Sequence, residues 1–162
     1  SDTLNITENG IKLNEKIKSG LTKQQENQIG NTQIKAMLVI GREKSSVKNI
    51  TVAGPNTYLN EIWEKAGGIN IFNDLTNKYA TVNIEEIIKR NPDIIIEFNL
   101  NTDEGINNIT PGEEWQYLNN VNAIRQKNMF EICGNYSLIP GPRVIKLAAD
   151  FGEIINLVNR QN

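Results

Sequence analysis

The chain has 162 residues, which is enough for one domain with a hydrophobic core. Hydrophobic residues make up 38%, charged residues 22%, and the formal net charge is −2, so the composition is that of a globular protein and lacks the basic character of nucleic-acid binders. Histidine is absent, which removes the commonest general base and metal ligand, and the single cysteine, Cys133, excludes an internal disulfide. No apolar run approaches the roughly 20 residues that a membrane span needs.

The first third of the chain predicts a helix followed by a strand. Residues 6–25 have helical character, with lysines and glutamates between the apolar positions. The apolar stripe consists of Ile6, Leu13, Ile17 and Leu21. Residues 24–33 are polar and predict a loop, and the apolar residues 34–40 predict a strand.

A second strand and a well-delimited helix follow. Residues 50–53 predict a short strand that ends at the turn pair Gly54-Pro55. Asn56 or Thr57 can cap the next helix, and Gly67-Gly68 ends it, because one glycine can adopt the left-handed conformation beyond the last turn. The apolar face of this helix consists of Leu59, Ile62, Trp63 and Ala66.

Residues 79–99 contain a loop, a helix and a buried strand in succession. Residues 79–82 predict a loop, and Asn83 predicts the N-cap of a helix, with Glu86 placed to complete a capping box. Asn91-Pro92 ends that helix, because a residue before proline is disfavoured in the α conformation. The β-branched residues 93–98 are apolar on both faces, which is typical of a strand covered on both sides.

The last third predicts one more strand and a long helix. Residues 100–110 are expected to form a polar loop, and a short helix containing Trp115 begins at Pro111. Residues 129–133 predict a strand in which Cys133 is a buried structural residue, and residues 143–159 predict an amphipathic helix. Alternating strands and helices favour an α/β fold with an open, mostly parallel sheet flanked by helices.

The chemistry expected of this fold is binding rather than catalysis. Ligands of open α/β sheets bind beyond the carboxyl ends of the strands, and four loops are expected there: residues 41–49, 54–57, 99–110 and 134–142. None carries a phosphate-binding glycine motif, and the adjacent glutamates at 85–86 and 113–114 are interpreted as solvated charges in first helical turns. Tyr79, Tyr136 and Arg143 lie in or beside loops and suit stacking and hydrogen bonding to a large ligand.

Several blocks, in order, resemble one known family. They are VAGPNTYLNEI at 52–62, AGGINIF at 66–72, YATVNIEEII at 79–88, NPDIII at 91–96, the segment from Trp115 to Arg125, and GPR at 141–143. Together they resemble the C-terminal half of the helical-backbone (class III) solute-binding proteins of ABC importers, which take up ferric siderophores, haem and cobalamin.

The resemblance implies a division of the chain. Residues 34–162 would be the C-terminal α/β lobe, and residues 1–33 would be the end of the inter-lobe helix and a linker. The N-terminal lobe, which carries the other half of the site in this family, would then lie outside the given sequence. Such a lobe would bind its ligand together with the second lobe, deliver it to the membrane permease, and act outside the cytoplasm, in the periplasm or as a cell-surface lipoprotein.

The resemblance also implies roles for individual residues. Tyr79, Asn135, Tyr136 and Arg143 match ligand-contacting positions, although Arg143 could equally be structural, and Glu85 matches a glutamate that docks onto the permease. Charged residues that cobalamin binders often carry at 135–139 are replaced here, which favours a ferric chelate. Such a chelate needs neither a cofactor nor a protein ligand to its metal.

Two alternatives remain open at this point. One is an open α/β enzyme that binds a nucleotide, which would require a glycine-rich first turn and a general base. The other is an interaction module without a transport role, which would pair through an exposed apolar face.

Overall fold

The computed structural model describes residues 33–43, 45–100 and 103–161. The helix expected over residues 6–25, and with it the predicted inter-lobe segment up to residue 32, lies outside the described residues. None of the helices within the described part is long and apolar enough to cross a membrane.

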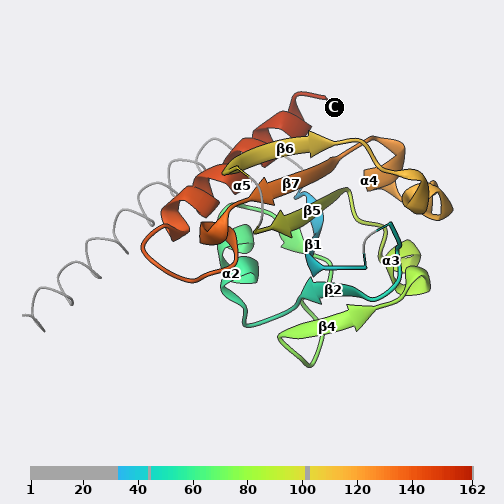
Figure 1. Ribbon diagram of the computed structural model, residues 1–162, viewed down its shortest axis with the longest axis horizontal. Helices are drawn as coiled ribbons and strands as arrows, with labels where there is room; N and C mark the ends of the chain where they lie inside the picture. Colours follow the sequence, from blue (N-terminus) through green and yellow to red (C-terminus); the bar gives the residue numbers. More distant parts are fainter. Residues whose placement is uncertain (1–32, 44, 101–102, 162) are drawn as a thin grey trace, which may run out of the picture.

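A parallel group of strands forms the centre of a seven-stranded sheet (Figure 1). It consists of β1 (Lys35–Gly41), β5 (Ile94–Asn99) and β7 (Met129–Cys133), with β5 between the other two. Each is buried along most of its length, which is why their sequences are apolar without alternation. These are the three strands that their apolar runs predict, and Cys133 is buried in the last of them as expected.

The outer strands make the sheet mixed rather than mostly parallel. β2 (Ile50–Ala53) is antiparallel to β1, and β4 (Tyr79–Val82) is antiparallel to β2. On the other side β6 (Gly105–Ile109) is antiparallel to β7, and the two-residue β3 (Ile69–Asn70) pairs with the start of β1. The antiparallel step from β1 to β2 follows from its short connection, because a parallel crossover needs about a dozen residues or more.

Two of the predicted loops are strands in the structure. Residues 79–82, expected to be a loop, form β4, and the polar stretch 100–110 contains β6. β6 was missed because Ile106 and Ile109 are three residues apart and give no two-residue alternation. Both strands lie at the ends of the sheet, where one partner suffices and the sequence pattern is weak.

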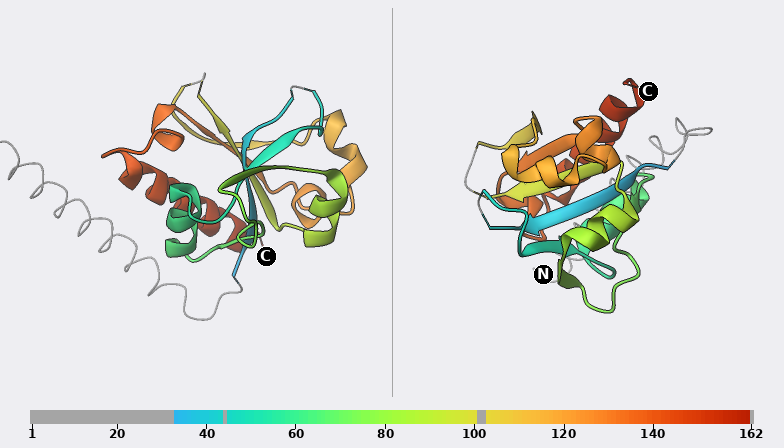
Figure 2. Two further views of the ribbon diagram at one scale, coloured as in Figure 1. Left: turned by 90° about the horizontal axis from the view of Figure 1, so that it is seen from below. Right: turned by 90° about the vertical axis from the view of Figure 1, so that its right-hand side faces the viewer.

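Helices cover both faces of the sheet (Figure 2). One face carries α2 (Tyr58–Lys65) and α5 (Val144–Asn159). The other carries α3 (Ile84–Arg90), α4 (Asn122–Arg125) and the 3-10 helix η1 (Glu113–Leu118). A second 3-10 helix, η2 (Asn135–Ser137), follows β7. Alternate residues of β1 divide between the two cores, with Leu38 on the α2–α5 side and Met37 on the α3 side.

The ends of α2 and α3 are those that the sequence predicts, whereas the helix expected from Pro111 is the 3-10 helix η1, which begins at Glu113. Thr57 caps α2, its hydroxyl oxygen accepting from the Asn60 N–H at 3.2 Å, and Gly67 follows with φ at 100°. Asn83 caps α3 and accepts from the Glu86 N–H at 2.8 Å. The capping box is not completed as expected: the Glu86 carboxylate does not accept from the Asn83 N–H but from Arg90 Nε, at 2.7 Å.

Candidate functional site

The carboxyl ends of β1, β5 and β7 lie at the same end of the sheet, and three loops leave from there. Asn99, at the end of β5, pairs with Cys133 at the end of β7, and Cys133 pairs in turn with Gly105 at the start of β6. The described residues of two of these loops, 42–43, 45–49 and 134–143, therefore lie at the same end of the sheet as residues 100 and 103–104 between β5 and β6 (Figure 2). The expectation that residues 54–57 also leave from it is wrong, because β2 is antiparallel to β1 and its carboxyl end points the other way.

A polar crevice of about 440 Å³ opens beside the ends of β1, β5 and β7. At its centre Arg42 donates from Nε to Glu97 at 2.7 Å and from Nη2 to Glu114 at 3.2 Å. The guanidinium of Arg42 also lies 5.3 Å from the centroid of the Trp115 ring. These contacts tie β1 and β5 to η1, so the ion pairs have a clear structural role at this edge of the sheet.

A buried tyrosine anchors the loop after β7. Tyr136 is only 3% exposed, and its hydroxyl donates to Asp150 Oδ2 at 2.5 Å. Lys146 Nζ donates to the same hydroxyl oxygen at 3.0 Å and lies 4.2 Å from the ring centroid. Burial, followed by the hydrogen bond to Asp150, raises the pKa of Tyr136 well above its ordinary range. The loop is therefore bound to α5 through a neutral phenol.

The predicted ligand residues of this loop differ in accessibility. Asn135 and Arg143 are exposed, whereas the ring of Tyr136 lies beneath Arg143, whose Cζ is 5.4 Å from the ring centroid. A ligand could stack on Tyr136 only after Arg143 moved aside. The roles of all three as ligand contacts stay predictions.

Tyr79 lies near the start of α2. It is the first residue of β4, pairs with Ala53 and is 45% exposed. Its neighbour Tyr58 donates its hydroxyl to the Ser137 carbonyl oxygen at 2.8 Å, and burial, then Tyr79 itself, raises the pKa of Tyr58. Tyr58 thus links the start of α2 to the loop that carries Tyr136, and it lies near enough to Tyr79 for the two phenols to interact electrostatically.

Sequence reasoning missed Tyr58 in this arrangement. The residue lies directly after the Gly54–Thr57 turn, in a block that marks the family, but a tyrosine at the first position of a helix has no distinguishing pattern. Only the contact between Tyr58 and Ser137, 79 residues apart in the chain, shows its place. We call Tyr58, Tyr79, Asn135, Tyr136 and Arg143 the tyrosine face.

Glu85 is placed apart from the tyrosine face. It is exposed in the first turn of α3, where a carboxylate is stabilised by the N-terminal end of the helix dipole. It borders a shallow depression of about 420 Å³ with residues 47–49 and 81–84. Because β4 separates Tyr79 from Glu85, the structure does not bring the predicted docking residue and the predicted ligand residues together.

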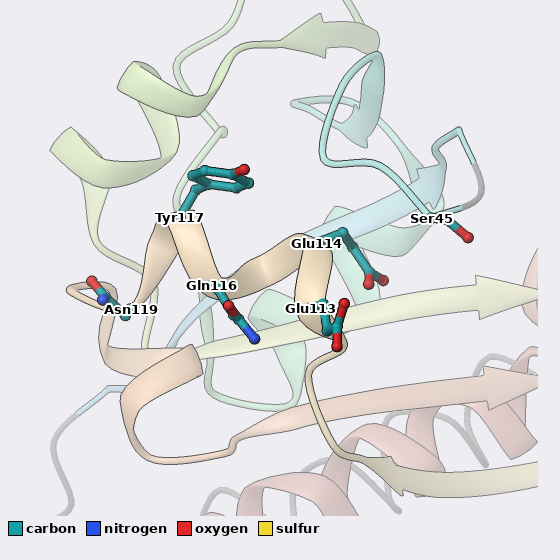
Figure 3. A pocket seen from close by; sticks show the side chains of 6 residues that line it. All are labelled: Ser45, Glu113, Glu114, Gln116, Tyr117 and Asn119. Atoms are coloured by element: carbon teal, nitrogen blue, oxygen red, sulfur yellow. The ribbon is translucent and has the colours of Figure 1, made fainter.

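An open polar hollow of about 780 Å³ lies along η1 (Figure 3). Glu113, Gln116 and Asn119 line it from η1 and the residues after it, and Ser45 closes it from the loop after β1. Tyr117 also lines the hollow and is 79% exposed. The described residues hold no group of three or more acidic or cysteine side chains arranged to bind a metal ion, here or elsewhere.

The comparisons with known proteins give a consistent result. The family model described as "Periplasmic binding protein" matches residues 7–136. A curated vitamin B12-binding protein of Vibrio parahaemolyticus serotype O3:K6 is 27% identical over 114 residues, which are 69% of this chain and 38% of that protein.

Solved structures of similar fold cover nearly the whole chain. The vitamin B12-binding protein BtuF of Vibrio cholerae aligns with a TM-score of 0.67 and 17% identity, over 86% of this chain and 51% of that one. A protein of an Fe3+-hydroxamate transport system from Saccharomonospora viridis DSM 43017 aligns with a TM-score of 0.70 and 14% identity, over 92% and 48%. The haem-binding protein HutB of Vibrio cholerae gives 0.66 and 17%, over 92% and 57%.

These alignments show the fold of the chain and how much of each similar protein it covers. The open α/β fold predicted from the sequence is that of the solved binding proteins, although this chain spans only about half the length of the proteins it matches. The family model covers most of the chain, including the blocks on which the resemblance rests between residues 52 and 125. The chain belongs to the periplasmic binding protein family.

Proposed function

We propose that this chain is the C-terminal lobe of the substrate-binding component of an ABC importer. The observation that carries the proposal is the family match combined with coverage: 86–92% of the chain aligns with proteins of which it spans about half. The missing half would be a second lobe, and residues 1–33 would include the end of the helix that joins the two. The protein would act outside the cytoplasm, free in the periplasm or anchored as a lipoprotein.

The ligand class is a bulky metal chelate. The similar proteins are named for vitamin B12, haem and Fe3+-hydroxamate, which share a large organic frame around a metal. The tyrosine face offers aromatic rings, an amide and a guanidinium, which suit stacking and hydrogen bonding to such a frame. A ferric siderophore fits best, because its chelator fills the coordination sphere of the iron, with haem and cobalamin as the other members of the class.

Exposed apolar side chains at the carboxyl ends of the strands support the proposal that a second lobe covers this end of the sheet. Ile139 is 60% exposed and Leu100 44%, and both follow strands that end at the carboxyl edge of the sheet. These two side chains leave apolar surface at this end of the lobe, and Tyr79 leaves more beside the start of α2, which a second lobe and a ligand would remove from water. We therefore place the ligand between the tyrosine face and the second lobe.

Replacing Tyr79 tests the ligand role. In the protein with both lobes, Tyr79→Ala should weaken binding of a ferric siderophore by roughly 1–2 kcal/mol, or about fivefold to thirtyfold, because a stacking ring is lost. Isothermal titration calorimetry measures this affinity. Tyr117→Ala is the matched control, since Tyr117 is more exposed and lies on η1, and it should leave the affinity unchanged. Equal affinities for the two variants would remove Tyr79 from the site.

Replacing Glu85 tests the docking role. Glu85→Ala should impair uptake of the ligand by cells while the affinity in solution stays the same, because an exposed first-turn carboxylate presents its charge to a partner. Glu61→Ala is the matched control, since Glu61 is an exposed glutamate in the first turn of α2. Uptake at the wild-type rate in the Glu85 variant would exclude a docking role.

A further inference from the structure

An ion pair covers the buried tyrosine of the tyrosine face. Arg143 Nη2 donates to Glu104 Oε2, while the guanidinium of Arg143 lies over the Tyr136 ring. Glu104 immediately precedes β6, whose first residue pairs with the last residue of β7 (Figure 1). Sheet pairing therefore holds Glu104 beside the loop that carries Arg143, although the two residues are 39 positions apart in the chain.

A glycine makes room for this arrangement. Gly134 has φ at 113°, and a Cβ atom there would lie 2.8 Å from Glu104 Cγ and 2.9 Å from Tyr136 Cε1. The stem of Glu104 and the edge of the Tyr136 ring thus pack on the same bare backbone position. Arg143 lies over the ring of Tyr136, which is 3% exposed, while Glu104 and the edge of that ring both lie close to Gly134.

The covering pair is accessible, whereas the contacts beneath it are not. The side chains of Arg143 and Glu104 are 56% and 42% exposed, so solvent or a competing anion can reach both. The hydrogen bond from Arg143 lowers the pKa of Glu104 below its ordinary value. By contrast, the bond from Tyr136 to Asp150 is buried. An incoming anion can therefore exchange with Glu104 without disturbing the anchor of the loop.

We propose that Glu104 determines specificity by occupying Arg143 in the unliganded lobe, so that an anionic group of the ligand binds there only by displacing it. This inference rests on the proposed function and adds to it a ligand property: charge. Chelates with free carboxylates compete with Glu104 for Arg143. Neutral hydroxamate chelates gain nothing by displacing Glu104, and they bind without Arg143.

Citrate, a small polycarboxylate, probes this competition in the chain as it stands. We expect Glu104→Gln to bind citrate at least about threefold more tightly than the wild type at 0.15 M salt, since exposed ion pairs contribute up to about fivefold. The Arg143 Nε–H resonance, followed by two-dimensional NMR, reports the binding site. Glu153→Gln, an exposed position on α5, is the control with the same change in net charge and should bind citrate as the wild type does.

Two results overturn the inference. One is equal citrate affinity in Glu104→Gln and wild type, and the other is an equal gain in Glu153→Gln, which would show a general effect of charge. The assay needs no second lobe, so its failure is separate from failure of the proposed function. That function is tested by Tyr79→Ala in the two-lobed protein, and a normal Tyr79 effect beside unchanged citrate binding would overturn the Glu104 inference alone.

Discussion

Phe151→Ala should lower the free energy of unfolding by about 3–5 kcal/mol, the range for removing a large aromatic ring from a core. Phe151 is completely buried on α5, at the centre of the core between the helices and the sheet. Its ring packs edge to face with Trp63 of α2 at a centroid distance of 5.2 Å and with Phe98 of β5 at 6.3 Å. Removing it leaves a cavity and ends both aromatic contacts.

Urea denaturation of the chain, followed by tryptophan fluorescence, measures this loss. Tyr117→Ala is the control for removing an aromatic side chain from the surface, because Tyr117 is 79% exposed, and it should change the stability by no more than about 0.5 kcal/mol. A loss below about 1.5 kcal/mol for Phe151→Ala would mean that this core is not packed as described.

Asp150→Ala should cost about 2–3 kcal/mol, because hydrogen bonds to charged groups contribute most and the Tyr136 hydroxyl would lose its acceptor. Asp150 is 7% exposed, accepts from Tyr136 at 2.5 Å and faces Lys146 at 3.5 Å. The substitution should also release the loop at residues 134–143 from α5. Compared with the wild type, amide hydrogen exchange should accelerate more in that loop than in β7, and this difference would show the release.

A neighbouring acidic residue provides the control for Asp150. Glu153 is exposed one turn further along α5, so Glu153→Ala should be near neutral and leave hydrogen exchange in the loop unchanged. If Asp150→Ala matched Glu153→Ala in stability, the buried bond to Tyr136 would not contribute to holding the loop.

The central strands and the helix ends could be predicted because their signals are local. The apolar runs that became β1, β5 and β7 are buried on both faces, and Asn83 caps α3 as its sequence context predicts. The apolar positions of α5 include Phe151, which reaches the core through the regular helical spacing. A buried strand requires an unbroken apolar run and a cap requires a particular residue type, so both can be recognised within a short stretch of sequence.

The sheet edges could not be predicted because pairing there is set by distant partners. β4 takes its strand conformation from pairing Tyr79 with Ala53, and β6 from pairing Gly105 with Cys133. Neither segment has an apolar alternation that distinguishes a strand from a loop. The antiparallel direction of β2 likewise depends on the length of its connection to β1 rather than on its own residues.

The same distinction applies to the tyrosine face. Residue type and family resemblance single out Tyr79, Asn135, Tyr136 and Arg143, but not their accessibility. The structure leaves Tyr79 exposed and places Tyr136 beneath Arg143, through contacts with residues remote in the chain such as Glu104. Sequence therefore suggested which residues to consider, and long-range packing decided which of them a ligand meets first.

The most direct test of the account compares this chain with the two-lobed protein in isothermal titrations with a ferric siderophore, haemin and cobalamin. A single lobe makes only part of the contacts, so we expect the two-lobed protein to bind one of the three at least about a hundredfold more tightly than the chain alone, which should bind weakly or not at all. Sub-micromolar binding of any of them by the chain alone would contradict the proposal that it is one half of a shared site.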